Sequence, residues 1–260
     1  MAKNEFVQML KYISLSLSLL IFSACIGIDD ITSDSSPISH DIWDALLQKH
    51  VDNTGLVNYR GFIRDSLEFN SYLNLLSKNH PNKENWSEDE ELAYWINTYN
   101  AFTVKLIIDY YPVKSIKDIA GSIPFINSPW DLKFIEIEGE TYDLNNIEHG
   151  IIREKFSEPR IHFALVCAAV SCPRLRNKAF TAERLDQQLE EEAKYFFNNP
   201  AKNKISADKL ELSKLLSWYW GDFKDVASSR AEYVNRYSKV KANPDAKVDY
   251  LEYSWELNEK

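Results

Sequence analysis

Two cysteines and two histidines in the second half of the chain have the residue types and spacing to do chemistry. His149 lies upstream of an apolar run that carries His162 and Cys167 and ends in Ser171-Cys172-Pro173. A cysteine beside a proline, at the end of an expected strand, lies where a thiol can be held and reached. This pattern indicates a nucleophile, a metal site or a disulfide, and the residues leave all three open.

The nucleophile hypothesis makes the Cys172 sulfur the attacking atom. A thiol needs a base to become a thiolate near neutral pH, and a third group to orient that base. We expect His149 to be the base because its separate helix is free to approach, with His162 as the other candidate. Glu148, next to His149 in the sequence, Asn97 or Asn100 would orient the imidazole.

The disulfide hypothesis pairs Cys167 with Cys172, which requires the four residues between them to turn tightly. An oxidising compartment would permit this bond. A zinc site is less favoured, because the His162, Cys167 and Cys172 spacing lacks the short ligand pairs of usual zinc sites. We therefore expect no metal and no cofactor.

Asn97 and Asn100 lie one turn apart on an expected helix and share one of its faces. Asparagine is a weak helix former, so the pair calls for an explanation. A buried hydrogen-bond network is favoured. The alternative is a cleft in which the two amides hold a substrate carbonyl or orient the histidine. Arg153 and Ser171 complete the candidate binding residues.

The first residues of the chain have the pattern of an export signal. Lys3 and Lys11 flank a basic start, residues 13–22 are largely apolar, and Ser23-Ala24 precede Cys25. The ending resembles the lipobox of bacterial lipoproteins. We expect a signal peptide over 1–24, a lipid on Cys25 and a flexible tether over 25–38.

Such a chain would be exported and anchored by its lipid to the bacterial cell envelope, on a periplasmic or surface face. The whole chain has a net charge of −9, and removal of residues 1–24, which carry +1, would leave −10. A chain this acidic gains nothing from phosphate neutralisation, so nucleic acid is not expected as a partner. A small molecule or a peptide remains a candidate ligand.

The expected elements favour a single α+β domain over 39–258, mainly helical, with a small sheet of short strands. Tryptophan, tyrosine and phenylalanine (7, 14 and 13 residues) supply ample material for its core. The clearest helix follows Ser87 and Glu90, which fit a capping box. Apolar spacing predicts helices over 39–51, 62–76, 87–111, 145–156, 181–197, 215–223 and 230–237, hairpins over 133–145 and 203–213, and strands over 161–167 and 247–253.

Four motifs resemble the family catalogued as domain of unknown function 547, in the form of its bacterial lipoprotein-type members. They are LAYWINTYNAFTVKLIIDYYPVKSI, NNIEHGIIR, HFALVCAAVSCPRL and YLEYSWELN. The resemblance runs from Trp43 to Asn258, and the chain has Ser254 where the family usually has an aspartate. The resemblance implies no particular chemistry. The family's signature positions fall on Asn97, Asn100, His149, His162, Ser171, Cys172 and Pro173.

Two functional hypotheses follow. The first is a thiol-dependent hydrolase or transferase that acts on amide or ester bonds, with Cys172 as nucleophile and His149 as base. The second is a non-catalytic module on the cell envelope that binds a ligand or a protein near Asn97, His149 and His162. Both require these side chains to converge on one accessible pocket.

Overall fold

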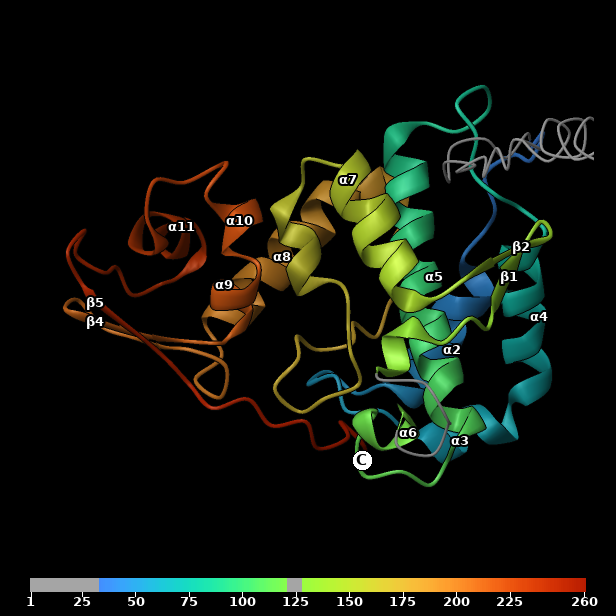
Figure 1. Ribbon diagram of the computed structural model, residues 1–260, viewed down its shortest axis with the longest axis horizontal. Coiled ribbons are helices and arrows are strands. Elements are labelled where there is room, and N and C mark those ends of the chain that lie inside the picture. The colour runs from blue at the N-terminus through green and yellow to red at the C-terminus, as the bar shows by residue number, and fades with distance from the viewer. Residues whose placement is uncertain (1–32, 121–127) are drawn as a thin grey trace, which may run out of the picture. The chain divides into compact units, whose positions relative to one another are not determined.

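The longest helix, α5 (Glu88–Asp109), is the element against which most others pack. Its first turn is closed by the expected capping box, in which Ser87 and Glu90 each satisfy a backbone N–H of the other. Sixteen of its 22 residues are buried, so neighbours cover it on every side. The computed structural model describes residues 33–120 and 128–260. Figure 1 shows α5 to the right of the centre, between α7 and α4.

Three helices lie on one side of α5: α2 (Asp41–His50), α3 (Tyr59–Arg64) and α4 (Ser66–Ser77). Their shared core is aromatic, and the Trp43 ring stacks with the rings of Phe69 and Tyr72. The single helix expected over 62–76 is two helices, and Asp65 lies at the break. Its carboxylate accepts a hydrogen bond of 2.6 Å from His50 Nε2 on α2, which ties the break to the neighbouring helix.

A hairpin packs against α4, as the alternating pattern predicted. Strands β1 (Ile135–Ile137) and β2 (Glu140–Tyr142) pair antiparallel, with Ile137 opposite Glu140. The two turn residues, Glu138 and Gly139, both have positive φ (48° and 88°), as a tight hairpin turn requires. The short helix α6 (Lys117–Ala120) precedes this region.

The segment from 146 to 163 differs most from expectation. It begins with a π-helix (Asn146–Ile152) that continues into α7 (Arg153–Lys155). The buried strand expected over 161–167 is wrong: a 3₁₀ helix spans Pro159–Phe163, followed by irregular backbone. The expected burial is present. However, the side chain of Asn100 on α5 makes hydrogen bonds with Ala164 O and Val166 N that a neighbouring strand would have made.

The last third of the chain forms a second hydrophobic core, between helices and a three-stranded sheet (Figure 1). Strand β4 pairs antiparallel with β3 and parallel with β5. Phe163 joins the 3₁₀ helix to this core through Phe196 and Phe223. The elements are α8 (Leu185–Phe197), β3 (Lys204–Ile205), β4 (Lys209–Leu212), α9 (Leu215–Trp218), α10 (Trp220–Phe223), α11 (Arg230–Tyr237) and β5 (Lys247–Tyr250).

Helices with two small sheets confirm the expected α+β class. The proposed signal peptide and Cys25 lie outside the described residues. Of the expected tether, residues 33–38 have no regular structure, yet they are bound to the domain: Trp86 Nε1 donates to the Ser35 carbonyl oxygen at 3.1 Å. In the described ranges, no helix has the length and apolarity needed to cross a membrane.

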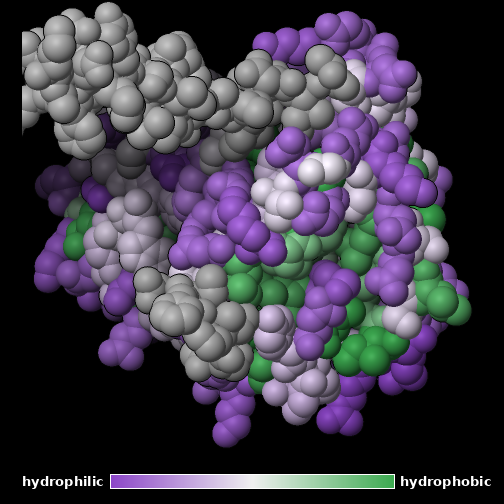
Figure 2. Space-filling model, turned by 45° about the vertical axis from the view of Figure 1, so that its right-hand side comes forward, coloured by the Kyte–Doolittle hydropathy of each residue, from purple (hydrophilic) through white to green (hydrophobic). Residues whose placement is uncertain are grey.

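The face drawn in Figure 2 is largely polar, with apolar residues in patches between polar ones. Among the described residues only eight large hydrophobic side chains are exposed. One of them, Trp218 on α9, is 49% exposed. It lies at the cavity described next.

Candidate functional site

A cavity of about 280 Å³ gathers four of the eight expected catalytic and binding residues. The histidines His149 and His162, the carboxylate Glu148 and both cysteines line it. Six of its lining residues are aromatic. The full lining is Tyr99, Trp130, Asn145, Glu148, His149, His162, Leu165, Cys167, Cys172, Pro173, Leu215, Trp218, Tyr219, Tyr253 and Trp255.

The π-helix presents Glu148 and His149 to this cavity. Single π-helical turns occur often at functional sites, because the wider turn changes the direction of side chains relative to an α-helix. The Glu148 side chain is 8% exposed and the His149 side chain 42% exposed. Their closest approach, Glu148 Oε1 to His149 Nδ1, is 4.0 Å, which is too long for a hydrogen bond.

Arg153, one turn after His149, determines which ring nitrogen of that histidine accepts a hydrogen bond. Its Nη1 atom donates to His149 Nδ1 at 2.9 Å, so Nδ1 acts as an acceptor and carries no proton. The rest of the guanidinium donates twice to Asp222 on α10, at 2.7 Å each. This two-point contact fixes the position of Arg153.

Asp222 also holds the second histidine. His162 Nε2 lies 2.7 Å from Asp222 Oδ2, and its ring stacks on Tyr219 with 4.0 Å between centroids. Burial lowers the pKa of His162, although the hydrogen bond to Asp222 opposes that shift. Burial alone would raise the pKa of Asp222, but hydrogen bonds from Arg153 and His162 hold it below its usual range.

Glu148 faces two phenols of the cavity. Burial raises the pKa of Tyr99 and of Tyr219, and interaction with the Glu148 carboxylate raises both further. Both hydroxyls therefore keep their protons near neutral pH and can donate to the carboxylate. The Glu148 carboxyl group is thus buried at the wall of the cavity, beside two hydroxyl donors.

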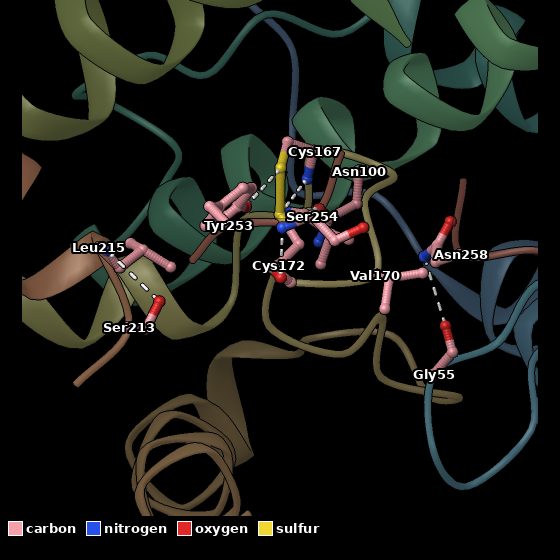
Figure 3. Close-up of a disulfide and its surroundings, with 12 residues drawn as sticks. Gly55, Asn100, Cys167, Val170, Cys172, Ser213, Leu215, Tyr253, Ser254 and Asn258 are labelled. Atoms are coloured by element: carbon pink, nitrogen blue, oxygen red, sulfur yellow. Dashed lines mark hydrogen bonds between the residues drawn. A yellow bond between two sulfur atoms is a disulfide. The ribbon is translucent and has the colours of Figure 1, made fainter. Parts of the chain in front are cut away.

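The two cysteines form a disulfide at the wall of the cavity, with 6.1 Å between their Cα atoms (Figure 3). This is the pairing that the disulfide hypothesis named. Tyr253 Oη donates to the Cys167 sulfur at 3.2 Å, because a sulfur in a disulfide has no proton to give. Cys172, 3% exposed, is therefore not a free thiol in this structure.

The loop between the cysteines is hydrogen-bonded to the end of the chain. Ala169 pairs with Leu257 in an isolated bridge, and Val170 N donates to the Glu256 carbonyl at 2.7 Å. Ser171 Oγ accepts from Ser254 N at 2.8 Å, so it holds the closing segment instead of facing a ligand. Since Tyr253 and Trp255 belong to that segment, these bonds position two rings of the cavity.

Asn97 and Asn100 do not line the cavity. Each amide makes two hydrogen bonds with a buried loop: Asn97 with the N–H and C=O of Phe180, and Asn100 with Ala164 O and Val166 N. The buried network favoured from the sequence is thus present. Asn100 nevertheless positions the site, because Val166 directly precedes Cys167.

Residues 83–197 match a family model described as "Protein of unknown function, DUF547". The chain resembles the DUF547 family. The matched segment contains α5, the π-helix, both histidines and both cysteines. No curated protein and no solved structure matches the chain. The DUF547 segment does not include Asp222, Trp218 or Tyr253, so part of the cavity wall lies beyond it.

Sequence reasoning found Glu148 but missed Asp222 and the aromatic rings of the site. The segment SWYWGDF supplies Asp222, Trp218 and Tyr219, and its apolar spacing predicts only a helix. Its density of aromatic side chains next to an acid was the available signal. Among the described residues, no group of three histidine, cysteine or acidic side chains could hold a metal ion.

Proposed function

We propose that the chain is a binding module that takes a small organic ligand into the aromatic cavity. The observation that carries this proposal is the convergence of six rings, a buried carboxylate and two imidazoles on one cavity of about 280 Å³. Ligand sites are typically concave and mostly apolar, with a few positioned polar groups. The polar groups here come from Glu148, His149 and His162.

The geometry of the wall supports binding without a conformational change. Arg153 and Asp222 fix both imidazoles, and the disulfide with its bonded loop fixes the segment that carries Tyr253. A preformed site avoids the entropic cost of ordering side chains when the ligand enters. Trp218, half exposed, gives the cavity contact with solvent.

A small-molecule library screened by ligand-observed NMR tests this proposal. Hits should bind the wild-type protein and lose at least tenfold in affinity with Trp218→Ala, which removes a wall ring. Tyr110→Ala is the matched control, because Tyr110 is an exposed aromatic residue that does not line the cavity. Hits that bind all three proteins equally would refute a ligand site in the cavity.

A thiol-dependent hydrolase or transferase is the second candidate. It is supported by Cys172, His149 and His162 lining the same cavity. His162 has the stronger geometry for a base, since Asp222 orients its ring, whereas His149 Nδ1 is occupied by Arg153. Catalysis at amide or ester bonds would require reduction of the bond to Cys167.

Cysteine labelling distinguishes the two candidates. In Cys167→Ser the Cys172 sulfur has no disulfide partner, and a reactive nucleophile would react with iodoacetamide in the folded protein with a thiolate pKa below ~8.5. If the chain is a binding module, we expect the buried Cys172 to react only after denaturation. Hydrolysis of model esters by Cys167→Ser, abolished by Cys167→Ser/Cys172→Ser, would favour the enzyme.

We also infer that the chain is exported and lipidated on Cys25. The basic start, the short apolar run and Ser23-Ala24 before the cysteine support this inference. The disulfide agrees with it, because such bonds persist mainly in oxidising compartments. Mass spectrometry of the membrane fraction should find the mature chain beginning at a diacylated Cys25. An unmodified chain in the soluble fraction would refute lipidation.

A further inference from the structure

We propose that the group recognised in the cavity is an organic cation, an amine or a quaternary ammonium, held between the Glu148 carboxylate and the faces of the surrounding rings. This inference rests on the proposed binding function and names its ligand class. It follows from the charge of the site and from the kind of side chain that lines it.

The fixed charges around the cavity leave one negative charge without a matching cation. Asp222 and Arg153 neutralise each other through their two-point contact. His149 is neutral because Nδ1 accepts from Arg153, and His162 is neutral because of its burial. Glu148 therefore carries the remaining charge. A buried charge without a cationic partner is costly, so a ligand cation that binds there is stabilised.

The phenol hydroxyls of Tyr99 and Tyr219 can donate hydrogen bonds to the Glu148 carboxylate, but they supply no positive charge. Among the described residues that line the cavity, no lysine or arginine is present. An anionic ligand would meet the Glu148 carboxylate with no lysine or arginine among the lining side chains of the described residues. The wall therefore discriminates by charge as well as by shape.

The rings supply the second half of the recognition. Tryptophan and tyrosine faces attract cations through their quadrupole, and aromatic cages are the usual recognition sites for quaternary ammonium groups. Trp218, Tyr253 and Trp255 contact one another, with centroid distances of 4.7 to 6.1 Å. Trp130 extends this cluster through Trp255, at 5.6 Å.

Two of the wall rings already bind cations of the chain itself. Lys117 Nζ lies 3.9 Å from the centroid of the Trp255 ring. The guanidinium carbon of Arg153 lies 5.2 Å from the centroid of Tyr219. These contacts show that rings of this wall attract positive groups. Among the described residues no cation lies over Trp218 or Tyr253, which contact other rings and the Cys167 sulfur.

Choline and its neutral carbon isostere, 3,3-dimethyl-1-butanol, test the inference with shape held constant. Tryptophan fluorescence titrations on the full chain should show choline binding at least tenfold more tightly than the isostere. Glu148→Gln removes the charge with little change in shape and should weaken choline at least tenfold, leaving the isostere unchanged. Glu154→Gln is the matched control, because Glu154 is an exposed acid on the adjacent turn that does not line the cavity.

Equal affinity of the two probes for the wild-type protein would overturn the cation inference, and this comparison does not depend on any variant folding. If both bind equally and Trp218→Ala weakens both, the ligand site stands and only its charge preference is lost. If neither probe binds at millimolar concentration, the cation inference is overturned, and the library screen alone decides whether the cavity binds ligands.

Discussion

The imidazole of His162 donates from Nε2 to Oδ2 of Asp222 across 2.7 Å, although the two residues are 60 positions apart in the sequence. The same carboxylate accepts two hydrogen bonds from Arg153. One acid thereby joins the 3₁₀ helix, the turn after the π-helix and α10 at one side of the cavity. The pocket depends on this junction between the two halves of the described chain.

Burial of histidines predicts that the fold loses stability as the pH falls below about 6.5. Burial lowers the pKa of His40 to about 4 and also lowers the pKa of His162 and His80. The unfolded chain takes up protons at these rings from about pH 6.5 downward, while the folded chain does not, so protonation favours unfolding. His40 alone accounts for up to about 3 kcal/mol between pH 6.5 and 4.

Urea titrations at pH 7 and pH 5 measure this loss as a fall in the free energy of unfolding. His40→Gln and His162→Gln should each reduce the difference between the two pH values. Above pH 5 the low pKa of Asp222 keeps that group ionised in both states, so it adds little to the difference. A free energy that stays constant from pH 7 to pH 5 would contradict neutral buried histidines.

Asn100→Ala should affect both stability and binding, whereas Asn97→Ala should affect stability alone. Each amide makes the same pair of buried hydrogen bonds, so each substitution should cost about 2–4 kcal/mol of unfolding free energy. Only the loop bound by Asn100 leads into the cavity wall. Ligand affinity measured on the folded fraction should fall several-fold in Asn100→Ala and stay unchanged in Asn97→Ala.

The matched pair controls for a general loss of stability. Equal losses of affinity in the two variants would mean that destabilisation alone weakens binding, and that Asn100 has no specific role in positioning the wall.

Removal of the disulfide should lower stability modestly and preserve the pocket. A bond that closes so short a loop contributes about 2 kcal/mol through the unfolded chain. Urea titration of Cys167→Ala/Cys172→Ala should therefore give an unfolding free energy that is lower by about 2 kcal/mol. A reductant should lower the unfolding free energy of the wild-type protein to that of the double variant. It should leave the unfolding free energy of the double variant unchanged.

Ligand affinity in the double variant should stay within about threefold, because Asn100 and the bonds to the closing segment still hold the loop. Complete loss of binding in a folded double variant would assign the sulfurs a direct role in the ligand contact.

Local signals in the sequence predicted local structure well. The capping box at Ser87, the hairpin turn at Glu138-Gly139 and the helix at α11 depend on neighbouring residues, and each is present. The buried strand expected over 161–167 failed because apolar content reports burial and not backbone conformation. The backbone N–H of Val166 in this segment is satisfied by Asn100, which is 66 residues away in the sequence.

The candidate site was predicted in part. His149, His162, Glu148 and Cys172 line one cavity, and no local pattern fixes that convergence. Asp222 could not be chosen from the sequence, since it is one of many acidic residues and its role follows from contacts with distant segments. The different surroundings of the two histidines have the same cause: Arg153 donates to His149, and Asp222 orients His162.

The seven tryptophans allow the central claim to be tested in one spectrum. Trp130, Trp218 and Trp255 line the cavity, whereas Trp43, Trp86, Trp95 and Trp220 do not. In ¹⁵N-labelled protein, titration with the tightest hit of the library screen should shift the indole Nε1–H signals of the first three and leave the other four in place. Shifts centred on the other four tryptophans, or saturable binding with no shift in the first three, would contradict a ligand site in this cavity.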